Sequence, residues 1–110
     1  MKYGNEKTMV NGILFDSKLE ANRYWELSIL QRAGKIKNLK LQPEYELQPA
    51  FRKNGKAFKR ISYIADFEYQ QDGKTIVEDT KGFRTEVFRL KEKLFEYKYP
   101  NLEIKEIREK

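Results

Sequence analysis

A two-residue turn signal, Asp72-Gly73, lies at the midpoint between Asp66 and Asp79, and no other feature constrains the fold as strongly. Asp-Gly favours the tight turn of a two-residue β-hairpin. Paired residues in such a hairpin lie at equal distances from the turn, so Asp66 is predicted to lie opposite Asp79. Their Cβ atoms would be roughly 5 Å apart on one face. The sequence therefore predicts two strands that bring two aspartates together.

Two carboxylates at that separation repel each other, and a divalent cation between them would remove the repulsion. Lys81 follows Asp79 by two residues, and the alternation of side chains along a strand places it on the same face. A bulged three-residue turn would instead place Glu78 opposite Asp66. An exposed ion-pair cluster without a function would also contain these residue types. The shared face with Lys81 favours the pairing of Asp66 with Asp79.

The absence of histidine and cysteine narrows the chemistry that the chain can perform. It excludes disulfides, a thiolate nucleophile and a zinc–thiolate site. It also removes the commonest general base. A metal ion would need oxygen ligands, so we expect a hard cation, Mg²⁺ or Mn²⁺.

The charge of the chain points to a polyanionic partner. Lysine and arginine number 23 against 17 aspartates and glutamates, giving a net charge of +6. Nucleic acid and an anionic membrane surface both fit this excess, and so does an ordinary soluble basic protein. Because the sequence shows no long apolar run and no signal peptide, we expect a cytoplasmic protein with no membrane partner.

Hydrophobic periodicity and turn signals predict two helices and several strands. The helices cover residues 17–33, between an N-cap at Asp16 or Ser17 and a C-cap at Gly34, and residues 85–99, before Pro100. The predicted strands are 8–10, 13–15, 44–52, 57–69, 74–81 and 102–107. This order, α-β-β-β-α-β after a small N-terminal hairpin, predicts one mixed α/β domain over residues 1–110. Apolar residues on both faces of the second hairpin predict a central sheet flanked by helices.

Each predicted helix carries an apolar stripe that is expected to face the core. The stripe of the first helix consists of Leu19, Tyr24, Leu27 and Leu30, with Trp25 and Ile29 on the opposite flank. The stripe of the second helix consists of Val87, Leu90, Leu94 and Tyr97.

Glu20 and Arg84 are further candidates for a functional role. Ser17-x-x-Glu20 is a capping box, in which the Glu20 carboxylate satisfies a backbone donor. Glu20 also falls within the apolar stripe of its helix, and from there it could be directed at the two aspartates. Both interpretations remain open. Arg84 comes just before the second helix, at a position where phosphate is readily bound, whereas Lys91 belongs to the basic face of that helix.

Taken together, these motifs resemble the PD-(D/E)XK nuclease superfamily. Its restriction-endonuclease-like core is α-β-β-β-α-β, and its signature is an aspartate followed, on the next strand, by an acidic residue, any residue and lysine. Asp66 and the triplet Asp79-Thr80-Lys81 match that signature, although Ala65 replaces the proline that often precedes the first aspartate. With Glu20 and Gln42-Pro43 added, residues 12–100 are similar to small phage-encoded endonuclease-like proteins and to the endonuclease subunit of some cut-and-paste transposons.

The resemblance implies a Mg²⁺- or Mn²⁺-dependent DNA endonuclease with one or two ions per site, encoded by a phage or prophage and acting in a bacterial host. Its catalytic residues would be Glu20, Asp66, Asp79 and Lys81. Glu20, Asp66 and Asp79 would hold the metal, and Lys81 would position the attacking water and stabilise charge on the phosphate. Arg84, Lys91 and Gln42 would contact the nucleic acid.

Several alternatives stay open at this level. A non-catalytic module of αβββα type that binds double-stranded RNA or DNA would explain the charge and the element order. An inactive nuclease fold would also preserve the topology. For an active enzyme, the small size favours recognition of branched or junction DNA over a long sequence. Cutting two strands needs two active sites, so a homodimer is also compatible with the sequence.

Overall fold

The computed structural model describes residues 6–80 and 85–108, so Lys81 and Arg84 lie outside the described residues. Two helices and ten strands form within the described ranges, which confirms a mixed α/β fold. Their bounds are β1 Thr8–Val10, β2 Ile13–Phe15, α1 Lys18–Arg32, β3 Lys37–Leu41, β4 Glu44–Gln48, β5 Phe51–Lys53, β6 Lys56–Phe58, β7 Ile61–Ile64, β8 Phe67–Gln71, β9 Lys74–Asp79, α2 Glu86–Lys98 and β10 Ile104–Glu106. Neither helix is long and apolar enough to cross a membrane.

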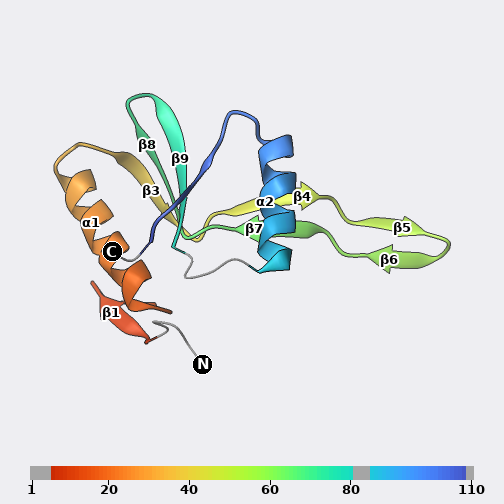
Figure 1. Ribbon diagram of the computed structural model, residues 1–110, viewed down its shortest axis with the longest axis horizontal. Coiled ribbons are helices and arrows are strands. Elements are labelled where there is room, and N and C mark those ends of the chain that lie inside the picture. Colours follow the sequence, from red (N-terminus) through yellow and green to blue (C-terminus); the bar gives the residue numbers. More distant parts are fainter. Residues whose placement is uncertain (1–5, 81–84, 109–110) are drawn as a thin grey trace.

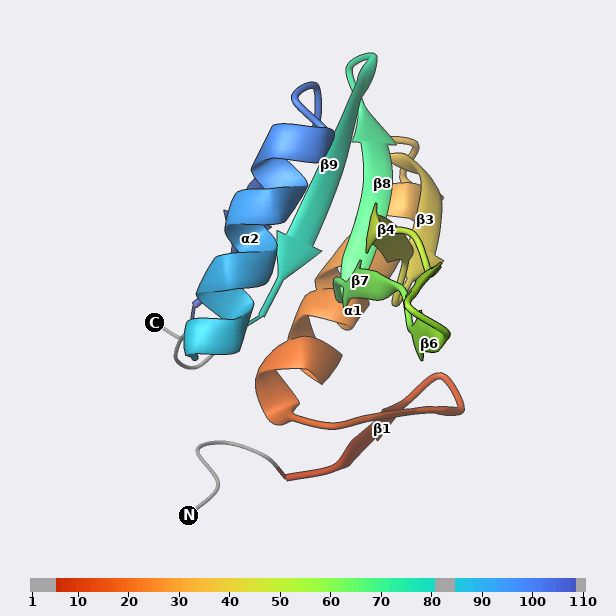
Figure 2. The ribbon, with the colours of Figure 1, turned by 90° about the vertical axis from the view of Figure 1, so that its right-hand side faces the viewer.

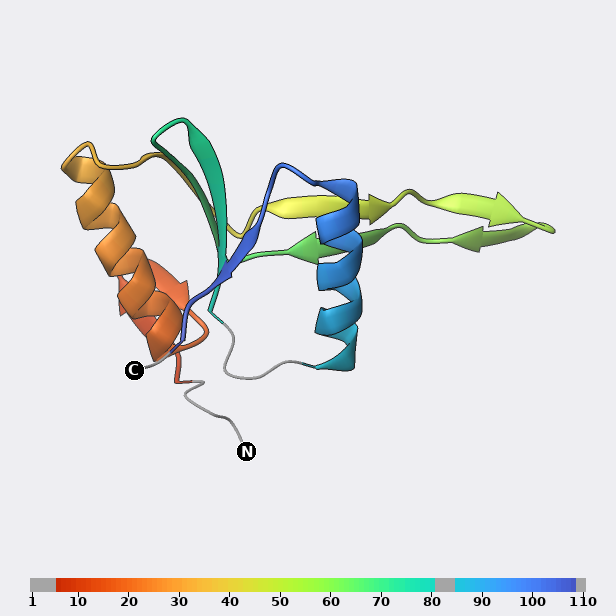
Figure 3. The same cartoon turned by 45° about the horizontal axis from the view of Figure 1, so that its top comes forward.

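A four-stranded sheet with the order β10-β9-β8-β3 forms the centre of the molecule. β10 runs parallel to β9, whereas β8 is antiparallel to both of its neighbours. Helix α1 lies on one side of this sheet and α2 on the other, as Figures 1 and 3 show. The expected short strand near the C-terminus is therefore present, at residues Ile104–Glu106.

Helix α1 begins after the predicted N-cap, Ser17, and its C-cap is Ala33, one residue before the predicted Gly34. The Ser17 hydroxyl oxygen accepts a hydrogen bond from the Glu20 amide (3.1 Å), and Gly34 follows the helix with a φ of 77°. Leu27 is buried in a cluster with Phe15, Ile36, Phe67 and Tyr69, and Tyr24 and Leu30 pack against that cluster. Trp25 and Ile29 are exposed on the opposite flank. The predicted apolar stripe of α1 is thus confirmed for Tyr24, Leu27 and Leu30, whereas Leu19 is half-buried and is not part of this cluster.

The predicted apolar stripe of α2 is wrong for three of its four residues, whereas Leu94 packs against the core. Val87, Leu90 and Tyr97 are exposed, Tyr97 by 88%. The buried face instead carries Phe88 and Phe95, which are seven residues apart and therefore share one side of the helix. Their rings lie in an aromatic cluster in which Phe95 makes edge-on contacts with two tyrosines of β4 and β7. Because the aromatic rings bury more apolar area than the aliphatic stripe, they determine which side of α2 faces the core.

The register of the second hairpin is confirmed over the whole length of β8. The ladder runs from Gln71 opposite Lys74 to Phe67 opposite Glu78. Asp72 and Gly73 have φ values of 51° and 78°, as a type I′ turn requires at both central positions. The bulged three-residue turn is therefore wrong for this hairpin. The N-terminal hairpin, β1–β2, also has the predicted register.

The predicted strand over residues 57–69 is divided into β6, β7 and β8, and β3 was not predicted at all. The chain bends at two segments that are hydrogen-bonded to each other, Gln42-Pro43 and Ala65-Asp66. The Gln42 amide donates to the carbonyl oxygen of Asp66 (2.9 Å), and the Ala65 amide donates to that of Pro43 (3.1 Å). Gln42 has a φ of 51°, and Pro43 has no N–H for a regular ladder. Beyond the bend, β4 and β7 leave the central sheet and continue into β5 and β6 (Figure 1).

Candidate active site

The two predicted site aspartates lie at one end of the central sheet. Asp66 occupies the bend between β7 and β8, and Asp79 is the last residue of β9. The end of β9 and the first turns of α1 lie at the same end of the molecule, as Figure 2 shows. The fold therefore brings together three segments that carry predicted site residues: the bend, the end of β9 and the start of α1.

Asp66 is oriented by Thr80 rather than by pairing with Asp79. Its carboxylate atom Oδ2 accepts hydrogen bonds from both the amide and the hydroxyl of Thr80, each 2.7 Å long. Its own amide donates to the carbonyl oxygen of Glu78 (3.1 Å), one residue out of the hairpin register. The expected direct cross-strand pair is therefore not part of the ladder, which ends at Phe67 and Glu78. Asp66 lies in the bend, and β8 begins only at the next residue, Phe67.

Asp79 is completely buried, and Tyr63 is its described hydrogen-bond donor. The Tyr63 hydroxyl donates to Oδ2 of Asp79. Burial raises the pKa of Tyr63 far above its ordinary value, and the negative charges of Asp79 and then Asp66 raise it further. The Tyr63 phenol thus stays protonated and can donate a hydrogen bond, and the charges of both carboxylates favour its protonated form. Asp66 and Asp79 lie at the same end of the sheet, because Asp66 binds Thr80, the residue after Asp79, although the two aspartates do not pair across the ladder.

We expect Tyr63→Phe to reduce the free energy of unfolding. The substitution keeps the ring among Tyr45, Phe88 and Phe95, but it removes the donor from a buried carboxylate. Losing the partner of a buried polar group costs about 1–3 kcal/mol. Denaturation by guanidinium chloride, monitored by circular dichroism, measures the loss.

Tyr97→Phe is the matched control, because the Tyr97 side chain is exposed and its hydroxyl should contribute nearly nothing. Equal stability of Tyr63→Phe and the wild type would contradict a stabilising bond between Tyr63 and Asp79.

The opposite face of β9 contains a buried ion pair that the sequence analysis missed. Glu78 is completely buried, and Arg23 of α1 binds it with two hydrogen bonds: Nε to Oε1 (2.7 Å) and Nη2 to Oε2 (2.6 Å). The Tyr69 hydroxyl also donates to Oε2. The hydrogen bonds that Arg23 donates to the Glu78 carboxylate raise the pKa of Arg23 well above its ordinary value. A sequence signal existed, because strand alternation places Glu78 with Phe67 and Tyr69 on the face that α1 covers.

Glu20 is buried on α1, with only 6% of its surface exposed. Its amide donates to Ser17, which is one half of the predicted capping box. Arg23, about one turn further along this side of α1, contacts Glu78. This side of the helix therefore lies against the face of β9 that carries Glu78, whereas the Asp79 carboxylate points to the other face, towards Tyr63. The structure thus places Glu20 near the end of β9 that carries Asp79, but on the side of the sheet that α1 covers.

The donor chemistry of the site suits magnesium. Within residues 6–80 and 85–108, no three acidic side chains lie close enough together to hold a metal by themselves. Mg²⁺ needs no such cage, because it keeps several waters and is usually bound by one or two carboxylates together with substrate phosphates. Hydrogen bonds on one oxygen of a carboxylate also orient ligating carboxylates, and Asp66 and Asp79 each have such bonds on Oδ2. The two aspartates therefore fit a magnesium ion that carries waters.

The predicted nucleic-acid contacts are placed only in part. Gln42 is exposed and lies beside Asp66, because its amide binds the Asp66 carbonyl oxygen. Lys91 is on α2 and is partly buried. Lys81 and Arg84 fall outside the described residues, so the predictions for these two side chains stay predictions.

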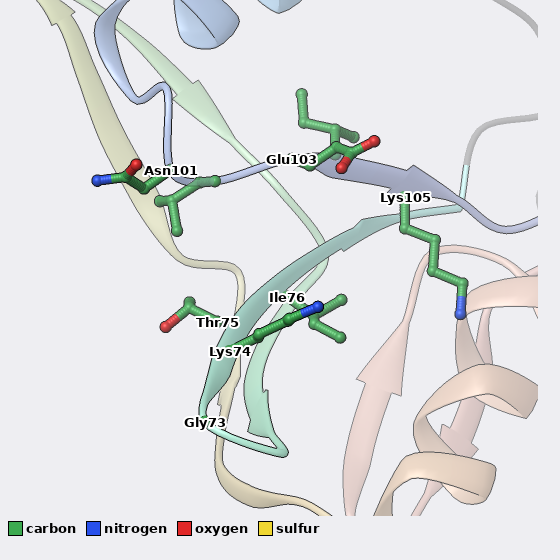
Figure 4. A pocket seen from close by; sticks show the side chains of 9 residues that line it. Gly73, Lys74, Thr75, Ile76, Asn101, Glu103 and Lys105 are labelled. Carbon is green, nitrogen blue, oxygen red and sulfur yellow. The ribbon is translucent and has the colours of Figure 1, made fainter.

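A shallow groove lies at the other end of β9, away from the aspartates. Residues 73–76 and 101–105 line it, between the Asp72-Gly73 turn and the segment that leads into β10 (Figure 4). Glu103 is its single acidic side chain, beside Lys74 and Lys105. The groove therefore lacks the paired carboxylates that distinguish the other end of the sheet.

A family model described as "Protein of unknown function (DUF1064)" matches residues 1–109. No curated protein and no solved structure matches the chain.

Proposed function

The chain belongs to the DUF1064 family, whose description states no activity. From its own residues, we propose that it is a metal-dependent DNA endonuclease. The observation that carries the proposal is the cluster of Asp66, Asp79 and Tyr63 at one end of the central sheet. Each aspartate is oriented by hydrogen bonds on one oxygen, and the Asp66 carboxylate binds the amide of Thr80, the residue that follows Asp79. A structural role alone gives no reason for collecting two carboxylates there.

The order of elements supports the same proposal. Helix α1, the bent strand pair, β9, α2 and the parallel strand β10 follow the α-β-β-β-α-β order of a restriction-endonuclease-like core. The acidic residue-x-lysine triplet, Asp79-Thr80-Lys81, occurs where β9 ends. The proposal thus joins a sequence signature to the end of the sheet at which Asp66 and Asp79 both lie.

In this proposal each residue has a defined task. Asp66 and Asp79 would hold a Mg²⁺ ion, and that ion would supply an activated water and neutralise charge on the phosphate. Tyr63 and Thr80 fix the orientation of the two carboxylates. Lys81 stabilises the negative charge on the phosphate, and Glu20 adds an acidic group from α1. No histidine is needed as a base, which agrees with the composition of the chain.

Branched DNA is the substrate class that we propose. A homodimer would supply the two active sites that are needed to cut two strands. With purified wild-type protein, we expect Mg²⁺ or Mn²⁺ to support cleavage of a labelled four-way junction. EDTA should abolish cleavage, because the attacking water is no longer activated. Denaturing gel electrophoresis of junction, nicked and linear DNA measures both the activity and the preference.

Linear duplex of the same sequence is the control for structure preference. Equal cutting of junction and linear DNA would contradict the proposed substrate class but not the nuclease activity. DNA binding without cleavage in any divalent metal would contradict the nuclease and favour the non-catalytic binding module.

A further inference from the structure

A two-stranded arm projects from the domain, and no site residue discussed above lies on it. The basic arm, defined as residues 51–60, contains β5, the Asn54-Gly55 turn and β6, and it forms the far end of the bent ribbon in Figures 1 and 3. The radius of gyration of the molecule is 15.8 Å. A compact chain of this length would have about 13 Å. The arm thus extends the molecule well beyond its core.

The basic arm carries most of the net charge of the chain. It contains no acidic residue and five cations: Arg52, Lys53, Lys56, Lys59 and Arg60. The rest of the sequence has 18 lysines and arginines against 17 aspartates and glutamates, a net charge of only +1. Among the described residues, Arg60 is the one cation of the arm that forms an ion pair, with Glu44. Four of the five charges are therefore available to an anionic partner.

The arm also presents an aromatic pair to solvent. Phe51 and Phe58 pair across the strands and stack with ring centroids 4.8 Å apart, yet they remain 43% and 37% exposed. Lys56 lies over the Phe58 ring, 5.2 Å from its centroid. Because side chains alternate along a strand, Lys53 and Lys56 share the face of this pair, whereas Arg52 and Ala57 occupy the other.

An isolated two-stranded hairpin is only marginally stable in water, so an exposed arm of this kind gains stability from a partner. A second copy of the arm is a poor partner, because the two sets of cations would repel each other. A DNA duplex is a good one. Paired strands lie about 4.8 Å apart, and the major groove, about 12 Å wide, admits a two-stranded ribbon between two rows of phosphates.

We infer that the basic arm binds duplex DNA by lying in the major groove, with its lysines against the phosphates. The inference rests on the proposed function in taking DNA as the partner. It extends that function by assigning substrate binding to a structure separate from the aspartates. The four residues of β7 connect the arm to the bend that contains Asp66. DNA held by the arm would thus be tethered beside the candidate active site.

The first test measures binding in EDTA, so that it is independent of cleavage. We compare wild type with Lys53→Gln/Lys56→Gln/Lys59→Gln, using fluorescence anisotropy of a labelled duplex at several salt concentrations. The slope of log K against log salt concentration is negative, and each lost phosphate contact reduces its magnitude by about 0.9. The triple variant should therefore reduce the magnitude of the slope by nearly 3. Its affinity at 0.1 M salt should fall by roughly 100-fold or more.

The matched control is Lys35→Gln/Lys37→Gln/Lys74→Gln, which removes three exposed lysines at the Asp72-Gly73 end of the central sheet. It makes the same change in net charge, so equal losses in the two triple variants would overturn the inference. Binding of wild type to anionic vesicles but not to DNA would overturn it as well. Arm-dependent DNA binding without any metal-dependent cleavage would support the arm while contradicting the nuclease.

The second test addresses the groove. Methyl green, which occupies the major groove, should displace the protein from the duplex, whereas netropsin, a minor-groove ligand, should not. The opposite result would overturn the placement. A duplex of RNA should bind more weakly than DNA, because the A-form major groove is deep and narrow. Equal binding of both duplexes would also contradict placement of the arm in the major groove.

Discussion

Asp79→Asn should abolish most DNA cleavage while leaving DNA binding intact. The amide keeps the size of the carboxylate and an oxygen that accepts from Tyr63, but it removes the negative charge that binds a metal ion. A catalytic metal contributes several kcal/mol to the transition state, so we expect a loss of roughly 100- to 1,000-fold in cleavage rate. Single-turnover cleavage of a labelled junction in Mg²⁺ measures the loss. Anisotropy in EDTA measures binding, which should be unchanged or slightly tighter because one negative charge is gone.

Asp72→Asn is the matched control for this variant. It makes the same chemical change on the same hairpin, and Asn-Gly forms a type I′ turn as readily as Asp-Gly does. Asp72 lies in the turn, at the far end of β9 from Asp79. Equal cleavage by Asp79→Asn and the wild type would remove Asp79 from the active site. Loss of cleavage in both aspartate variants would show an unspecific effect of charge.

Arg23→Met should destabilise the fold more than any other single change discussed above. Glu78 has no exposed surface, and Arg23 binds both of its carboxylate oxygens. Removing one partner of a buried ion pair costs about 3–5 kcal/mol, because the other charge stays buried and unpaired. For a domain of this size we expect the midpoint of thermal unfolding to fall by about 12 °C or more. Differential scanning calorimetry measures the midpoint.

A double variant separates the ion pair from the packing of the arginine side chain. Arg23→Met/Glu78→Gln removes both charges and keeps an oxygen that accepts from Tyr69, so it should recover most of the lost stability. Arg32→Met is the control, because Arg32 is exposed in the last turn of the same helix. A loss in Arg32→Met as large as that in Arg23→Met, or no recovery in the double variant, would contradict an essential buried pair.

The hairpin turns and the helix ends of this protein could be predicted from the sequence because they depend on a few adjacent residues. Asp72 and Gly73 adopt positive φ values, and that conformation sets the register of β8 and β9. Ser17 starts α1 with its own hydroxyl group, and Thr85 starts α2 in the same way. Each of these features is decided within about four residues of chain, so a local pattern is sufficient evidence.

The candidate site could be predicted only in part. The sequence placed Asp66 and Asp79 at one end of a hairpin, and the structure supports that proximity because the Asp66 carboxylate binds the amide of Thr80, the residue after Asp79. The sequence did not predict the bend that turns the Asp66 carboxylate to Thr80. The bend depends on hydrogen bonds between the chain at Gln42-Pro43 and the chain at Ala65-Asp66, which are more than twenty residues apart.

The sequence by itself determined the turns, the register of β8 and β9, the helix ends and the exclusion of histidine and thiolate chemistry. Only the tertiary structure decided which face of α2 is buried, which carboxylate pairs with an arginine, and that residues 51–60 leave the core as an arm. Arg23 and Glu78, for example, are separated by 55 residues and meet only when α1 packs on the sheet. Turns and caps arise from local backbone conformation, whereas burial and ion pairing depend on surfaces that distant segments bring together.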